Sequence, residues 1–142
     1  MIIRGRFIGD APYLPAYLSC EHFHGLVWFL IDTGASRTTL LDRDVKLLSI
    51  PSDAIFPALL PIVGIGGSVR SFLVQGVEMT LASNEGDLLL RQDLCLVQHD
   101  LEQLPPEEVA RILRLPSVLG RDLINRFQLS YDYQAGIVQL KR

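Results

Sequence analysis

The stretch Leu26-Val27-Trp28-Phe29-Leu30-Ile31-Asp32-Thr33-Gly34-Ala35-Ser36 decides how this chain is interpreted. Its first six residues are all apolar, and a run of that kind predicts a strand that is buried on both faces. An ionised aspartate directly after such a strand must be stabilised by hydrogen bonds or by another charge. Thr33 supplies a hydroxyl, and Gly34 lets the backbone fold close to the carboxylate. The small Ala35 and Ser36 leave the turn uncrowded, so the aspartate is the first candidate for a catalytic group.

The composition of the chain narrows the class of protein. With 142 residues, 49% of them hydrophobic, we expect a single domain over residues 1–142. The net charge of -3 shows no cationic excess of the kind that binds nucleic acid or anionic lipid. The longest fully apolar run, residues 26–31, is far shorter than the roughly 18 residues that span a bilayer. Residues 1–6 lack the apolar stretch of a secretory signal. We therefore expect a cytoplasmic protein without nucleic-acid or membrane partners.

Most of the chain consists of short β-branched and aromatic runs separated by Gly, Pro, Asn and Asp, which predicts an all-β domain built from hairpins. We expect strands at 4–8, 13–21, 26–31, 128–133 and 136–140, and two more that flank an Asn84-Glu85-Gly86 turn. Residues 40–61 are expected to form a connection. One or two short helices are predicted, at 105–114 and 121–127, the first with Glu107 one turn before Arg111.

Two further motifs follow the aspartate. Glycines interrupt the extended stretch Ile62-Val63-Gly64-Ile65-Gly66-Gly67-Ser68-Val69, which predicts a mobile hairpin. A phosphate-binding loop is the alternative, but neither GxxxxGK[ST] nor a complete GxGxxG is present. Later, Val118-Leu119-Gly120-Arg121-Asp122 places an apolar pair and a glycine directly before a predicted helix.

In this order, the motifs resemble those of the retropepsin-like aspartic proteases, the family of the retroviral proteases and their cellular and prokaryotic relatives. The resemblance covers residues 13–140 and is weakest over 84–115. It implies a closed barrel or β-sandwich domain, no cofactor and no metal. The catalytic turn that it implies consists of Asp32, Thr33 and Gly34. The substrate-binding residues that it implies are Ala35, Ser36, Gly64, Ile65, Gly66, Gly67, Val118 and Leu119, the glycine-rich hairpin acting as a flap over an extended peptide.

The chain contains one Asp-Thr-Gly and no Asp-Ser-Gly, and its 142 residues are too few for two lobes of roughly 100 residues each. In the family, two such turns meet, and their aspartates share a proton and bind one water. The resemblance therefore implies a homodimer in which Asp32 of each subunit forms a dyad and Thr33 braces the opposite turn. Aspartic proteases are the standard example of paired carboxylates that cannot both ionise cheaply. The expected activity is hydrolysis of peptide bonds in extended peptides, and the terminal segments 1–6 and 137–142 are candidates for the interface.

Several alternatives stay open at this stage. Ser36 stands where the retroviral enzymes have an aspartate that pairs with the arginine after the later glycine, so the partner of Arg121 is not defined. Cys20, His22 and His24 alternate and would share one face of a strand, as a metal site or as a polar hairpin edge. The two cysteines are far apart and are predicted to be reduced. A non-catalytic peptide-binding or dimerisation module with the same fold is the alternative function.

Overall fold

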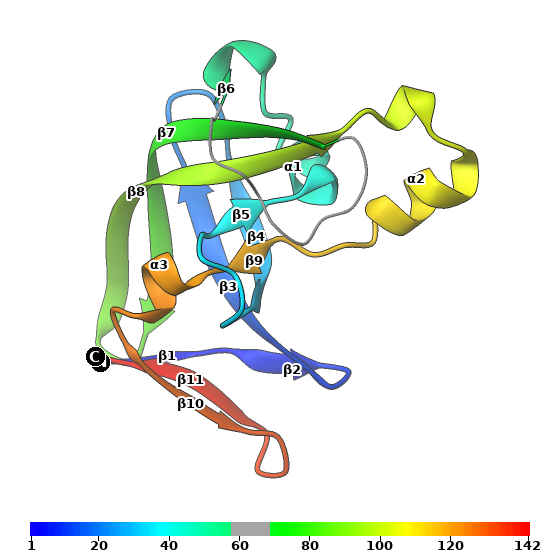
Figure 1. Cartoon of the computed structure of the whole chain (residues 1–142). Coiled ribbons are helices and arrows are strands. Elements are labelled where there is room, and N and C mark those ends of the chain that lie inside the picture. The colour runs from blue at the N-terminus through cyan, green and yellow to red at the C-terminus, as the bar shows by residue number, and fades with distance from the viewer. Residues whose placement is uncertain (58–68) are drawn as a thin grey trace.

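Figure 1 shows the computed structural model of the chain, which describes residues 1–57 and 69–142. Strands make up 52% of the structure, which confirms the all-β prediction. The strands are β1 (Ile2–Arg4), β2 (Arg6–Ile8), β3 (Ala11–Ser19), β4 (His24–Ile31), β5 (Thr39–Leu40), β6 (Phe56–Pro57), β7 (Val69–Ser83), β8 (Gly86–His99), β9 (Val118–Leu119), β10 (Gln128–Asp132) and β11 (Ile137–Lys141). The helices are α1 (Asp42–Leu47), α2 (Pro106–Ile112) and α3 (Arg121–Ile124), with single 3-10 turns at Ser52–Ala54 and Leu101–Gln103.

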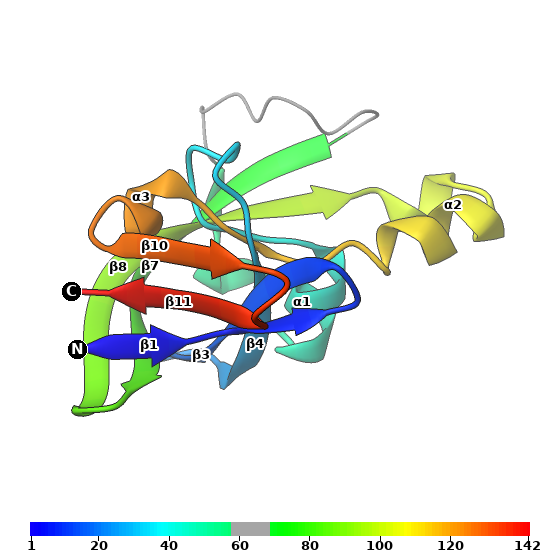
Figure 2. The same ribbon diagram turned by 90° about the horizontal axis from the view of Figure 1, so that it is seen from below.

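The sheet closes on itself into a barrel. Hydrogen bonding runs in the order β7-β8-β5-β9-β4-β3, and β3 pairs again with β7, which completes a ring of six strands. The pairs β4–β9 and β5–β8 are parallel, whereas β3–β4, β5–β9 and β7–β8 are antiparallel. A second group of strands, β10-β11-β1, continues from β7 and forms a separate ribbon at one side of the barrel (Figure 2).

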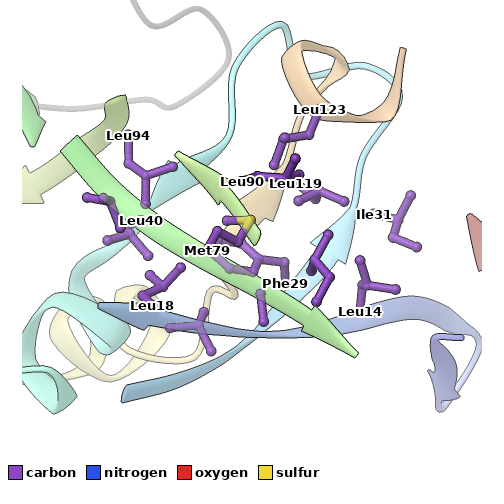
Figure 3. Close-up of a cluster of buried hydrophobic side chains, with 14 of the residues drawn as sticks. Leu14, Leu18, Phe29, Ile31, Leu40, Met79, Leu90, Leu94, Leu119 and Leu123 are labelled. Atoms are coloured by element: carbon purple, nitrogen blue, oxygen red, sulfur yellow. The ribbon is translucent and has the colours of Figure 1, made fainter. Parts of the chain in front are cut away.

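Apolar side chains from most of the ring fill the barrel. Figure 3 shows Leu14 and Leu18 of β3, Phe29 of β4, Leu40 of β5 and Leu119 of β9 converging in one cluster. All five of these side chains are fully buried. Burial of a Leu or Phe side chain stabilises a fold by about 1.5–3 kcal/mol. This core fixes the carboxyl end of β4, where the chain enters the Asp32 turn.

The expectation that 26–31 is buried on both faces is wrong. Within β4, burial alternates: the odd-numbered residues from Val27 to Ile31 are buried, whereas Leu26 is 58% exposed and Trp28 is half-buried. A barrel wall turns only one face to the core, and this physical reason outweighs the uninterrupted apolar sequence. The guanidinium of Arg6 covers the outer face of Trp28, 4.4 Å from the ring centroid, a contact that shields the ring and adds a cation–π attraction.

Two other predictions, both for the N-terminal half of the chain, need correction. The strand expected at 4–8 is divided into β1 and β2, because the chain bends at Gly5, where a Cβ would lie 2.3 Å from the Tyr13 carbonyl oxygen. The connection expected at 40–61 contains helix α1 and strand β6. Of the glycine-rich hairpin expected at 62–69, residues 62–68 lie outside the described residues, and Val69 is the first residue of β7.

The predicted helices exist but are shorter. Pro105 precedes α2 as its cap, and α2 ends at Ile112 rather than at residue 114. The arginine in its last turn, Arg111, pairs with Glu108 and not with the expected Glu107. Helix α3 ends at Ile124, and the next three residues form a turn. Differences of a few residues between the predicted and the observed helix ends are common, because tertiary contacts decide where a helix is capped.

Buried polar contacts hold α1 against its neighbours. The Asp42 carboxylate accepts the backbone N–H of His99 at 2.8 Å and lies 2.6 Å from His99 Nδ1, and both side chains are 5% exposed. One turn later, the Asp44 carboxylate accepts the Ser117 hydroxyl at 2.6 Å. Carboxylates this buried must be paired. They attach the end of β8 and the start of β9 to the helix that follows the Asp32 turn.

Candidate active site

Asp32 is positioned by the parallel pair of β4 and β9. The backbone N–H of Leu30 donates to the Ser117 carbonyl at 2.9 Å, and the N–H of Asp32 donates to the Leu119 carbonyl at 3.1 Å. Both strands are anchored in the core through Ile31 and Leu119. The aspartate is therefore the first residue beyond a rigid strand pair, and its side chain is half-buried.

The turn after Asp32 is closed by its own backbone. The Ala35 N–H donates to the Asp32 carbonyl at 3.1 Å, and the Gly34 N–H donates to Asp32 Oδ1 at 2.9 Å. A Cβ on residue 34 would lie 3.1 Å from that same carboxylate oxygen. Glycine at position 34 therefore lets a backbone donor approach the carboxylate without crowding it. Among the described residues, Asp32 Oδ2 accepts no hydrogen bond from the protein, which leaves this oxygen free to bind water.

Helix α3 holds the same turn from behind. The backbone N–H of Arg121 donates to the Ala35 carbonyl at 2.9 Å, and the Arg121 side chain donates through Nη1 to the Thr33 carbonyl at 2.8 Å. The partner of Arg121, left open by Ser36, is thus a backbone carbonyl of the aspartate turn. The N–H of Asp122 reaches the Ser36 carbonyl at 3.3 Å. The carbonyls of Thr33, Ala35 and Ser36 therefore all accept hydrogen bonds from the first two residues of α3.

A buried hydrogen-bond network, missed by sequence reasoning, lies beneath the turn. Thr38 is 1% exposed. Its hydroxyl donates to Asp122 Oδ1 at 2.8 Å and accepts the Gly120 N–H at 3.1 Å. Asp122 Oδ1 also accepts the N–H groups of Thr38 at 2.9 Å and of Leu123 at 3.0 Å. The position of Asp122 in the first turn of a predicted helix could have indicated a helix cap. Its contact with Thr38, 84 residues away, could not have been found from the sequence.

The surroundings of Gly120 explain why the sequence has a glycine after the apolar pair Val118-Leu119. A Cβ at this position would lie 2.4 Å from the carbonyl carbon of Arg37 and 2.6 Å from its oxygen. No side chain fits there, so the two loops can cross in contact only with glycine at position 120. Cys95 lies below the same crossing, its N–H donating to the Thr38 carbonyl at 3.3 Å. Burial raises the pKa of the Cys95 thiol, although the nearby Arg37 acts in the opposite direction.

The structure brings together most of the residues that were predicted from the sequence to be catalytic or substrate-binding. Asp32, Thr33 and Gly34 form the turn with Ala35 and Ser36, and Thr33 and Ser36 are exposed beside the half-buried aspartate. Val118 is half-buried on β9 next to this turn. Leu119 is fully buried, so its side chain belongs to the core and only its carbonyl serves the site, a correction to its expected role in substrate contact. The stretch Gly64-Ile65-Gly66-Gly67 lies outside the described residues.

The alternating Cys20, His22 and His24 do not converge on a common point. His24 Nδ1 lies 2.8 Å from the Tyr17 hydroxyl, and His22 Nε2 lies 3.9 Å from a carboxylate oxygen of Glu21. Over residues 1–57 and 69–142, no three His, Cys, Asp or Glu side chains are arranged to hold a metal ion.

Comparison with known proteins supports the fold and not a particular activity. No family model matches the sequence, and no curated protein does. Among solved structures, a retropepsin-like aspartic protease from Rickettsia conorii matches with a TM-score of 0.55 and 18% identity, over 99% of this chain and 88% of that chain. The EIAV protease, solved with an inhibitor, matches with a TM-score of 0.52 and 17% identity, over 84% of this chain and 89% of that one.

A third structure is the retroviral protease-like domain of Ddi1 from Leishmania major. It matches with a TM-score of 0.56 and 10% identity, over 95% of this chain and 97% of that domain. All three matches have a probability of 1.00 and extend over most of both chains. Together with the closed barrel and the parallel strand pair that ends in Asp32, they show that the chain has the fold of the retropepsin-like aspartic proteases.

Proposed function

We propose that this chain is an aspartic endopeptidase that acts as a homodimer and hydrolyses peptide bonds in extended peptides. The observation that carries the proposal is the Asp32 carboxylate. It stands at the end of a rigid strand pair, with Oδ1 held by the Gly34 N–H at 2.9 Å and Oδ2 free of described protein donors. A carboxylate fixed in this way is oriented for acid–base chemistry on a water.

One chain supplies only half of the required site. Water activation by paired carboxylates needs one ionised and one protonated group, and neighbouring carboxylates adopt this state because both cannot ionise cheaply. The sequence offers a single Asp-Thr-Gly. Thr33, next to the aspartate, is exposed in the isolated chain. A two-fold partner would bring a second Asp32 beside the first and cover Thr33.

The proposed chemistry then uses only residues of the two turns. The ionised Asp32 takes a proton from the water as the water attacks the peptide carbonyl, and the protonated Asp32 of the other chain donates to the carbonyl oxygen. No covalent acyl-enzyme is formed. Around the dyad, Ala35, Ser36 and Val118 would contact the peptide, and the stretch 64–67 would cover it as a flap. Among the described helices, none has the length and apolarity to cross a membrane.

The test is digestion of an unfolded protein at acidic pH by the purified chain and by Asp32→Asn. We expect cleavage by the wild type that a transition-state-mimicking aspartic protease inhibitor blocks, and none by Asp32→Asn, which keeps the fold and the dimer. Asp87→Asn, at an exposed position on β8, is the matched control and should cleave normally. Cleavage by Asp32→Asn at the wild-type rate would remove Asp32 from the mechanism. A wild type that binds peptides without cleaving them would favour the non-catalytic module.

A further inference from the structure

A small cavity lies outside the Asp32 turn, where four segments of the chain meet. They are the β3–β4 turn, the 3-10 turn Ser52–Ala54 with β6, a bend in β7, and β8. Figure 1 shows the first three of them close together at the top of the molecule. The cavity encloses about 250 Å³. Pockets for drug-sized ligands measure roughly 300–1,000 Å³, so this one suits a smaller molecule.

A β-bulge in β7 forms one wall of the cavity. Gln75 and Gly76 stand opposite the single residue Asp93 of β8, so β7 has one extra residue here. The Asp93 carboxylate accepts the Gly76 N–H at 2.9 Å and fixes the bulge. Gly76 has a φ of +65°, a conformation that favours glycine, and a Cβ there would lie 3.6 Å from Arg91 Nη2. The guanidinium of Arg91 therefore lies against the bulge, at the wall of the cavity.

The charge of Arg91 has no partner among the described residues. Glu78 lies directly opposite Arg91 in the β7–β8 register, a position in which opposite charges commonly pair. None of the ion pairs within residues 1–57 and 69–142 includes either side chain, however. The planar guanidinium is a strong, bidentate donor to carboxylates. This wall of the cavity therefore offers a binding group for a carboxylate.

An acidic group lines the same cavity from the 3-10 turn. Asp53 is exposed, and in the described part of the chain it forms no ion pair with Arg91 or with any other base. Two further lining charges, Glu21 and His22, lie 3.9 Å apart and partly compensate each other. A cation and an anion thus line one small cavity without meeting, and a ligand that carries both charges can bridge them.

Apolar side chains complete the lining. Val74 is 2% exposed and Ala54 6% exposed, so both belong to the core and present a dry surface to the cavity. Phe56 of β6 is 52% exposed and lines the cavity as well. Burial of apolar ligand surface against such groups is favourable by about 25 cal/mol per Å². The lining therefore suits a ligand that combines two opposite charges with an apolar part.

We propose that this cavity binds a small apolar α-amino acid, with the carboxylate on Arg91, the ammonium on Asp53 and the side chain against Val74 and Phe56. At neutral pH a free amino acid carries both charges. A ligand with a carboxylate alone would be repelled by Asp53, and a ligand with an amine alone by Arg91. No residue of the Asp32 turn lines the cavity, so the site goes beyond the proposed peptidase activity and does not depend on it.

The cavity contains its own reporter, the thiol of Cys20. Cys20 is partly exposed and lines the cavity, whereas Cys95 is buried and burial raises the pKa of its thiol. A thiol-specific reagent at neutral pH should therefore modify Cys20 first. Leucine at about 10 mM should slow this modification about tenfold, as expected for a Kd of about 1 mM. N-acetyl-leucine and leucinamide each lack one charge and should slow it less than about twofold.

Matched variants assign the two charges. Arg91→Gln and Asp53→Asn should each abolish protection of Cys20 by leucine. Arg70→Gln is the control, because Arg70 is an exposed arginine of β7 outside the cavity, and it should keep full protection. All three positions are exposed, so equal urea midpoints will confirm that the fold is retained.

Three results would overturn the proposal. Leucine without effect on the wild type would exclude the ligand, and full protection in Arg91→Gln or Asp53→Asn would exclude the assigned contacts. Equal protection by N-acetyl-leucine would show that the site takes a carboxylate alone, such as a peptide C-terminus, and not the free amino acid. Because the readout is thiol modification, a chain without peptidase activity gives the same answer, and failure of the proposed function stays distinguishable.

Discussion

Thr38→Val removes one hydroxyl from beneath the aspartate turn while keeping the shape of the side chain. The hydroxyl donates to Asp122 Oδ1 at 2.8 Å and accepts the Gly120 N–H at 3.1 Å, in a site where Thr38 is 1% exposed. Loss of a hydrogen bond to a charged group costs about 1.5–3 kcal/mol, and an unsatisfied buried N–H costs about 1–3 kcal/mol. The added methyl group returns about 0.8 kcal/mol. We expect a net loss of about 3 kcal/mol.

Urea denaturation at one fixed protein concentration measures this loss. With a slope of about 2 kcal/mol/M, the midpoint should fall by about 1.5 M. Thr80→Val is the matched control: Thr80 is half-buried on β7 and makes no side-chain hydrogen bond among the described residues, so its stability should change by no more than about 0.5 kcal/mol. Equal midpoints for the two variants would show that the Thr38 network does not stabilise the turn, and the reasoning that ties α3 to Asp32 would fail with it.

Three further predictions concern the surroundings of the turn. Gly120→Ala should cost about 1–3 kcal/mol in thermal denaturation, because its Cβ would overlap the Arg37 backbone at 2.4 Å; unchanged stability would contradict that crossing. Burial raises the pKa of the Cys95 thiol, so stability linked to this group is complete below about pH 8.5 and is lost as pH rises further. Cys95→Ala should lose less stability than the wild type between about pH 8.5 and pH 10, and equal losses would refute the shift. Asp42→Ala should cost about 1–3 kcal/mol in urea denaturation, because it leaves the His99 backbone N–H without its side-chain acceptor; an unchanged midpoint would contradict that role.

The sequence was sufficient for the parts of the fold that local patterns determine. An apolar run followed by Asp-Thr-Gly located the turn that holds Asp32, and alternating runs between turn residues predicted the all-β class. Gly120 was recognised as part of a motif, and the structure gives its reason, a 2.4 Å approach of the Arg37 backbone. The Asp-Thr-Gly turn and the strands were predictable because the interactions that control them lie within a few residues of the motif, whereas the contact that explains Gly120 comes from Arg37, far away in the sequence.

The misses all depend on contacts between distant segments. Helix α1 was overlooked because its stability comes from buried partners such as His99 and Ser117, which are 57 and 73 residues away from Asp42 and Asp44. The two-sided burial expected for 26–31 failed because the run alone does not reveal that β4 forms one wall of a barrel. The role of Arg121 needed the structure, since its partner is a backbone carbonyl and carbonyls leave no signal in sequence.

The claim that one active site is shared by two chains is tested most directly by mixing wild-type chain with Asp32→Asn at equal amounts. Peptidase activity is measured after full subunit exchange and compared with the same total concentration of wild type. If both copies of Asp32 are needed, random pairing leaves about one quarter of the activity, because only dimers of two wild-type chains are active. If each chain worked alone, about one half would remain. We predict one quarter, and a value of one half would contradict the shared site.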